Sequence, residues 1–316
     1  MAGGLAPALT ARAGLRVLGA VFVLWAAATI TFFAVRAVPG DPAETIIGGP
    51  GSQAGEEALA AARAEYGLDL PLWEQYLRYL GGLLSGDLGT SYALRAPVTE
   101  VIGEQLPGTL ALALTALLLG WALALLLVRQ AARGGRVSRV LGTIMEVTAA
   151  ALPHFWLGAV LILVFATTLG WLPSVSTPDL PGLILPALTL AIPLAGFLGQ
   201  VMRESADDAL ASTFALSARA RGESPAGLFW RHVLRHAVLP AASLSGWAFG
   251  TLISGAVIVE TLFARPGLGR TLFLAVQGRD VPVVTGTVLV VALAYVLITF
   301  AGDLLEMLVD PRRRRV

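Results

Sequence analysis

The stretch TFALSARARGESPAGLFWRHVLRHAVLP, from Thr213 to Pro240, is a polar, basic segment between strongly apolar ones. Its first part, Thr213 to Arg221, contains helix-forming residues and neither Gly nor Pro. Gly222 interrupts this pattern, and Ser224 followed by Pro225 is typical of a cap and the first position of a new helix. The sequence therefore predicts a helix, a glycine turn and a second helix, with an edge suited to a groove on another protein.

The segments on either side are too long and too apolar for the core of a soluble protein. Of the 316 residues, 56% are hydrophobic and only 14% are charged. Because about twenty apolar residues cross the hydrocarbon core of a bilayer, we predict an all-α integral membrane protein with about six transmembrane helices. The predicted spans are 17–35, 106–128, 140–169, 183–202, 241–263 and 281–308. Pro153 is expected to kink or break the third span.

Arginine is distributed unevenly along the chain. If the amino terminus is cytoplasmic and the chain crosses six times, 15 of the 22 Arg residues lie on the inner side, including Arg312 to Arg315. The positive-inside rule then predicts that both termini are cytoplasmic. A basic segment such as 213–240 is also typical of a loop that only sets topology, so its charge alone does not establish a docking role.

We expect three parts along the chain. Residues 1–36 are an N-terminal arm and the first transmembrane helix. Residues 37–105 are an extracytoplasmic segment with short helices at Glu56–Tyr66 and Leu72–Leu84. Residues 106–316 are a core transmembrane domain with a cytoplasmic loop at 203–240.

Several stretches resemble ABC-importer permeases of the dipeptide/oligopeptide/nickel subfamily, in the subunit type with a large first external loop. They are RAVPGDPAE, YGLDLPLWEQYLRYLGGLLSGDLGTSY, PVTEVIGEQLPGTLALA, LPHFWLG, LGWLP and VETLFARPGLGR, in this order. SARARG, from Ser217, with Leu239-Pro240 downstream, resembles the cytoplasmic EAA loop of the family. The literal Glu-Ala-Ala is absent, since Leu216-Ser217-Ala218 stand there.

This resemblance implies the type I ABC-importer permease architecture in a bacterial cytoplasmic membrane. The chain would form half of a translocation pathway for short peptides, or for nickel or another small solute. The implied partners are a second homologous permease, two ATPase subunits, an extracytoplasmic substrate-binding protein and membrane lipid, without nucleic acid. The segment 37–105 would cover the external mouth and meet the binding protein; a solvated linker is the alternative.

The composition argues against an enzyme. The chain has no Cys and no Lys, which excludes thiol chemistry and the lysine of a P-loop. ATP and Mg would therefore be bound by the partner ATPases, and we expect no cofactor, metal ligand or catalytic residue here. His232 and His236 share a helix face but lack the Glu of zinc proteases. A secondary transporter or self-contained membrane enzyme remains the alternative, although the predicted spans offer few carboxylates.

The resemblance implies an ATPase-coupling site, in which Arg219 supplies a charged contact and Gly222 the turn. Its candidate residues are Ser217, Ala218, Arg219, Ala220, Arg221, Gly222 and Glu223. In the fifth span, small residues recur every three or four positions, at Ser243, Gly246, Gly250 and Ser254. Such a stripe lines a pathway or a subunit interface, or packs within the chain.

Two acidic residues are expected near membrane depth, where charge is costly and faces a cavity or a partner. Glu260 ends the fifth span and could pair with Arg265 or Arg270 to hold an external gate, or lie in the headgroup region. Glu146 is expected near the cytoplasmic face, close to Arg139.

Overall fold

The computed structural model describes residues 5–37, 40–48, 55–132 and 135–309, which are mostly helical. Within these ranges the backbone forms no named strand, and Thr90 and Pro97 make an isolated bridge. The first elements are α1 (Leu5–Ala37), α2 (Pro42–Ile47), α3 (Glu56–Glu65), α4 (Leu72–Leu84), α5 (Val98–Ala132), α6 (Arg136–Ala151) and α7 (His154–Leu161). Then follow the π-helix η1 (Ile162–Thr168), α8 (Leu180–Ala211), α9 (Thr213–Ala220), α10 (Pro225–Leu228), the π-helix η2 (Phe229–Val233), α11 (Leu234–Leu262), α12 (Leu268–Gln277) and α13 (Val281–Val309). The predicted all-α class is confirmed.

Five described segments are long and apolar enough to cross a membrane, and a bent pair of helices makes up to six. The five are Gly14–Ala37, Val98–Gln130, Leu180–Ala211, Pro225–Leu262 and Val281–Gly302. The predicted number of spans is confirmed. The helix α8 is longer than its predicted span: it continues to Ala211, whereas the apolar pattern predicted an end at 202. The predicted basic tail at 312–315 lies outside the described residues.

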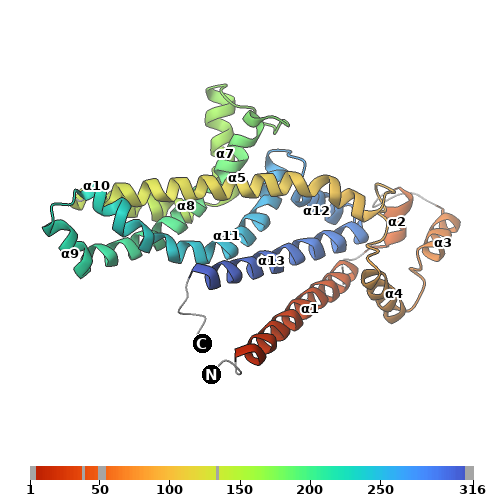
Figure 1. Ribbon diagram of the computed structural model, residues 1–316. Coiled ribbons are helices and arrows are strands. Elements are labelled where there is room, and N and C mark those ends of the chain that lie inside the picture. Colours follow the sequence, from red (N-terminus) through yellow and green to blue (C-terminus); the bar gives the residue numbers. More distant parts are fainter. Residues whose placement is uncertain (1–4, 38–39, 49–54, 133–134, 310–316) are drawn as a thin grey trace. The chain divides into compact units, whose positions relative to one another are not determined.

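The predicted break at Pro153 is present. The pair Val137–Ala151 and His154–Thr168 is bent by 103°. In Figure 1, α7 runs across the direction of α8, against which it packs. Leu152 adopts an extended backbone, with φ −70° and ψ 124°, because the ring of the following proline disfavours helical geometry in the residue before it. Pro186 and Pro193, by contrast, lie inside the continuous helix α8.

The chain divides into two compact units, 1–106 with 271–297 and 107–270 with 298–316. In the second unit, α6 and α11 pack against α8. Gly196 permits the approach of α6, because a Cβ there would lie 2.4 Å from the backbone nitrogen of Ala150. Small residues at such contacts allow close helix packing without a hydrophobic driving force between helices in lipid.

In the first unit, aromatic rings join the end of α1 to α4. The ring of Phe32 is buried and lies 5.3 Å from that of Tyr76 and 5.2 Å from that of Tyr79, measured between centroids. The hydroxyls of Thr29 and Tyr76 are 2.8 Å apart. The first span is therefore tied to the short helices that follow it by side-chain packing.

Candidate functional site

The segment between α8 and α11 forms the predicted helix, turn and helix. The Ser212 hydroxyl accepts a backbone hydrogen bond and caps α9. The helix is followed by Gly222, whose φ of 83° lies in the left-handed region that favours a residue without Cβ. The Ser224 hydroxyl accepts from the N–H of Gly227 at 3.1 Å, and Pro225 begins α10. Local sequence signals thus set this backbone.

One face of α9 is buried and the other is exposed. Ala215 and Ala218 are buried, whereas the Leu216 side chain is 67% exposed. Of the seven candidate coupling residues, five are exposed: Ser217, Arg219, Ala220, Arg221 and Gly222. The exposed face combines an apolar side chain with two guanidinium groups, which is a suitable composition for docking into a groove of a partner.

Glu223 is held by its own segment. Its carboxylate lies 3.1 Å from the guanidinium of Arg231 and 3.9 Å from the imidazole of His232. Only 19% of the Glu223 side chain is exposed. Because its charge faces the following helix, Glu223 stabilises the turn rather than contacting a partner protein.

The small-residue stripe lies on an accessible part of α11. Ser243 and Ser254 are exposed, and Gly246 and Gly250 are half-buried. The residues of α11 that this chain buries include Ala248 and Leu252. Gly246 lies near the backbone of α13, since a Cβ there would be 3.7 Å from the carbonyl oxygen of Ile298. Ser243 and Ser254 remain accessible to another helix or a pathway.

Glu260 is fully buried at the end of α11 and joins three helices. One carboxylate oxygen accepts a 2.6 Å hydrogen bond from the hydroxyl of Thr109 in α5. The other oxygen accepts from the backbone N–H groups of Gly269, at 2.8 Å, and Arg270, at 3.1 Å, in the first turn of α12. Thr109 also accepts from the N–H of Leu268 at 2.8 Å. The acid thus caps α12, where free N–H groups favour an anion.

Two glycines of the stretch RPGLG make this arrangement possible. A Cβ on Gly267 would lie 2.3 Å from the carboxyl carbon of Glu260. A Cβ on Gly269 would lie 2.5 Å from the Cα of Val257 in α11. Both positions need a residue without a side chain because the backbone of α12 approaches α11 and its buried acid directly.

The two arginines near Glu260 direct their guanidinium hydrogen bonds elsewhere, although Arg265 lies close enough to interact with the charge of Glu260. Arg265 donates to the hydroxyl of Ser176, at 2.9 Å. Arg270 donates to the carbonyl of Ala264, at 2.8 Å, where φ is positive. The sequence suggested an ion pair of Glu260 with one of these side chains. The hydrogen-bond partners are instead a hydroxyl and backbone N–H groups, because the start of α12 packs directly over the carboxylate.

Glu146 in α6 is also fully buried. The guanidinium of Arg203, in α8, donates to it at 2.6 Å, and the Arg203 side chain is 21% exposed. Arg139, the neighbour that the sequence suggested, instead faces Asp207 at 3.9 Å. The difference arises because α6 packs along α8, with Gly199 directly beside the Glu146 side chain.

Sequence reasoning did not single out Thr109, Ser176 or Arg203. Thr109 follows Pro107-Gly108 in a stretch that resembles the family. The neighbouring residues do not indicate which distant side chain a threonine in an apolar helix will contact. Arg203 is one of the 15 arginines that the topology prediction places on the inner side, and the sequence indicates no further role for it. The signal that could have found it is its place at the end of an apolar span, where a buried acid in another span needs a cation.

Two family profiles cover most of the chain. Residues 116–315 match the family described as binding-protein-dependent transport system inner membrane component. The chain belongs to this family of transport permeases. Residues 14–113 match its companion N-terminal family of binding-protein-dependent transport system membrane components. The permease therefore carries both parts, and the predicted family resemblance is confirmed.

Curated relatives match the permease along nearly its full length. The glutathione transport system permease protein GsiC of Salmonella paratyphi A is 37% identical over 303 residues, which cover 95% of this chain and 97% of the relative. The protein of the same name from Escherichia coli K12 is 35% identical with the same coverage. A solved structure, described as an amino acid ABC transporter with histidines, aligns with a TM-score of 0.49 at 17% identity, over 68% of this chain and 94% of that one. The permease is a multi-pass ABC-importer subunit of the bacterial inner membrane, as predicted.

Proposed function

We propose that this permease forms half of a translocation pathway for short peptide-like solutes. The observation that supports this most is the 37% identity to a glutathione permease over 95% of the chain, because glutathione is itself a tripeptide. Other small solutes of the subfamily, nickel among them, are less favoured by this relative. Both termini would lie in the cytoplasm, with α9 on the same side.

The proposal includes three kinds of partner protein. With no Lys, it has no P-loop lysine, so ATP and Mg belong to two ATPase subunits. A second homologous permease would complete the pathway, and its helices would lie against the stripe of Ser243, Gly246, Gly250 and Ser254. An extracytoplasmic binding protein would deliver the solute to the segment 37–105.

The coupling segment is the proposed point of force transfer. The exposed face of α9, with Leu216, Arg219 and Arg221, would enter a groove of an ATPase subunit. ATP binding would close the two ATPases and move α9. α9 directly follows α8, so this movement would bias the membrane helices between inward and outward opening.

Substitution at Gly222 tests this proposal. The position is exposed and a Cβ there would meet no atom within 4 Å, so a substitution leaves the packing unchanged and acts through backbone conformation and charge. We expect Gly222→Asp to leave the permease inserted and assembled with its ATPases, but to abolish the stimulation of ATP hydrolysis by the loaded binding protein. Gly222→Asn is the matched control, because Asn has the same shape and tolerates positive φ without adding a charge.

The expected result is uncoupling with Asp and largely retained uptake with Asn. Wild-type uptake of the solute by Gly222→Asp would contradict the coupling role. Purification of the permease without any ATPase subunit from cells that transport the solute would contradict the assembly.

A further inference from the structure

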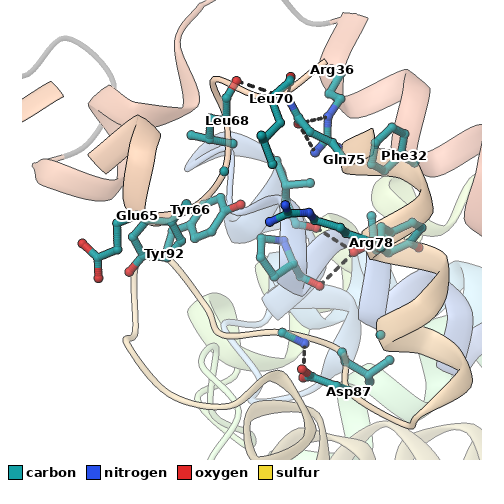
Figure 2. Close-up of a pocket in the computed structure, with 18 of the residues that line it drawn as sticks. Phe32, Arg36, Glu65, Tyr66, Leu68, Leu70, Gln75, Arg78, Asp87 and Tyr92 are labelled. Carbon is teal, nitrogen blue, oxygen red and sulfur yellow. Dashed lines mark hydrogen bonds between the residues drawn. The ribbon is translucent and has the colours of Figure 1, made fainter. Parts of the chain in front are cut away.

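The unit of residues 1–106 and 271–297 contains a cavity of about 470 Å³. It is lined by the end of α1, by α4 and its flanking loops, and by the start of α13. Figure 2 shows Arg36 beside Gln75 and Phe32 at one end and Asp87 at the other. The volume lies in the range of small-molecule sites, which are mostly apolar with a few convergent polar groups.

Arg36 is a half-buried charge that lines this cavity. Its Nε and Nη2 donate to the side-chain oxygen of Gln75 at 3.3 and 3.0 Å. Its guanidinium carbon lies 3.6 Å from the ring centroid of Phe32. Its Nη1 is buried and makes no hydrogen bond to any described residue. No carboxylate among the described residues lies within ion-pair distance of Arg36, so the cation lacks the partner that buried charges normally have.

Gln75 is itself fixed in place. Its amide nitrogen donates to the carbonyls of Leu68 and Leu70, at 3.1 and 2.8 Å. The carbonyl oxygen of the same amide is therefore aimed at Arg36, which orients the guanidinium. An orientation held in advance leaves Nη1 ready to donate without further ordering.

Two tyrosines add hydroxyl groups to the cavity. The Tyr79 hydroxyl is buried and makes no hydrogen bond of normal geometry within the described residues. The hydroxyl of the neighbouring Thr285 donates to the carbonyl of Val281, at 2.9 Å. Burial raises the pKa of Tyr92 to about 12, so its hydroxyl keeps its proton at physiological pH and can donate to an anion. The cavity thus has two tyrosine hydroxyls in addition to the Arg36 guanidinium.

The acidic residues of the cavity lie at its rim. Glu65, Asp69 and Asp87 are exposed, and Figure 2 shows Glu65 and Asp87 far from Arg36. A second cavity of about 400 Å³ shares Arg36, Gln75 and Tyr92, and its one acid, Asp41, is already paired with Arg63 at 2.6 Å. A cation inside and carboxylates outside match a ligand with a carboxylate at one end and an ammonium at the other.

We propose that this cavity binds a carboxylate group of a short peptide, with Arg36 as its charged anchor and Tyr79 as a second donor. The rim acids would face the ammonium end of the peptide. Arginine suits this role because its planar group donates to a carboxylate through two parallel N–H groups. The inference rests on the proposed peptide-like solute, and it adds a binding site on the permease itself to the one on the separate binding protein.

Equilibrium binding of radiolabelled glutathione to the full-length permease in lipid nanodiscs tests this site. We expect Arg36→Gln to weaken binding tenfold or more and Tyr79→Phe to weaken it about fivefold, since the latter removes one hydrogen bond. Arg95→Gln is the matched control, because this arginine belongs to the same unit but is exposed and lines neither cavity. A glutathione analogue with both carboxylates amidated should bind at least tenfold more weakly than glutathione to the wild type.

Thermal unfolding of each variant separates binding from folding. If Arg36→Gln does not fold, Tyr79→Phe decides, because it keeps the buried ring and removes only a hydroxyl whose one neighbouring polar side chain is Thr285. Unchanged affinity in Tyr79→Phe and Arg36→Gln, or equal binding of the amidated analogue, overturns the proposed site. So does cross-linking of position 36 to the binding protein with no binding of free peptide.

Uptake in cells is measured separately, so that the two proposals fail in different ways. Peptide uptake by the wild type, with unchanged binding in Arg36→Gln, overturns the cavity and leaves the proposed transport intact. Carboxylate-dependent glutathione binding that Arg36→Gln abolishes, without uptake of any peptide by the wild type, supports the cavity and overturns the proposed solute.

Discussion

The hydroxyl of Thr109 donates a 2.6 Å hydrogen bond to the carboxylate of Glu260, although 151 residues separate them in the sequence. The same carboxylate accepts from two N–H groups at the start of α12. One buried acid therefore holds α5, α11 and α12 together within the unit that contains residues 107–270. This junction is the proposed place where an external gate would be held.

Removing the buried acid should destabilise this junction. Glu260→Ala leaves the N–H groups of Gly269 and Arg270 and the hydroxyl of Thr109 without their acceptor. We expect a loss of about 3 kcal/mol or more in the free energy of unfolding, measured by thermal unfolding of the purified permease in detergent. The exposed Glu204→Ala in α8 is the control and should stay within about 0.5 kcal/mol of wild type. An equal effect of both variants would refute the role of the junction.

A methyl group at Gly267 should destabilise the same junction, but by less than the loss of the Glu260 carboxylate. Gly267→Ala places a Cβ 2.3 Å from the Glu260 carboxyl carbon, so α12 or the acid must move. We expect about 1 to 3 kcal/mol of destabilisation and reduced uptake. Gly302→Ala in α13, where a Cβ would meet nothing within 4 Å, is the control for glycine replacement. If the two variants unfold at the same temperature, the close approach is not a constraint.

The pair of Glu146 and Arg203 should show strong coupling. Arg203→Leu alone leaves a fully buried carboxylate without its cation, which costs about 3 kcal/mol or more. Replacing both with Leu removes the unpaired charge, so the double variant should be more stable than Arg203→Leu. Thermal unfolding of the two single variants and the double variant gives the coupling energy. Additive effects would contradict a direct interaction.

Asp41 and Arg63 form an ion pair in the segment 37–105, which we expect to lie outside the membrane. We therefore expect the stability of this segment to depend on pH. Burial raises the pKa of Asp41, but the N–H of Ala43 and the guanidinium of Arg63 outweigh it, so the net pKa is lowered. A pKa lower in the folded state means that the pair stabilises the fold above the unfolded-state pKa of about 3.9. This stabilisation is lost as the pH falls below that value.

The variant Asp41→Asn tests this pH dependence, because the amide oxygen can still accept from the N–H of Ala43. We expect Asp41→Asn to melt below the wild type at pH 7 and the difference to shrink as the pH falls below about 4. The exposed Asp69→Asn serves as the control. A difference that does not change between pH 7 and pH 3 would show that the charge contributes nothing.

The sequence by itself determined the features that depend on neighbouring residues. Long apolar runs predicted the spans, because burial of backbone polar groups in lipid requires continuous helices. Gly222 and Ser224-Pro225 predicted the turn and the helix start in the coupling segment, because glycine permits positive φ and proline fits a first helical position. Pro153 predicted the break between α6 and α7.

Only the tertiary structure decided which side chains meet. Glu260 accepts from Thr109 and the start of α12 rather than from a guanidinium, Glu146 is paired with Arg203 rather than Arg139, and Arg36 lines a cavity. Hydropathy and helix propensity are local properties. The partner of a buried charge depends instead on how closely distant helices pack, and glycines at the contacts, such as Gly267, set that distance.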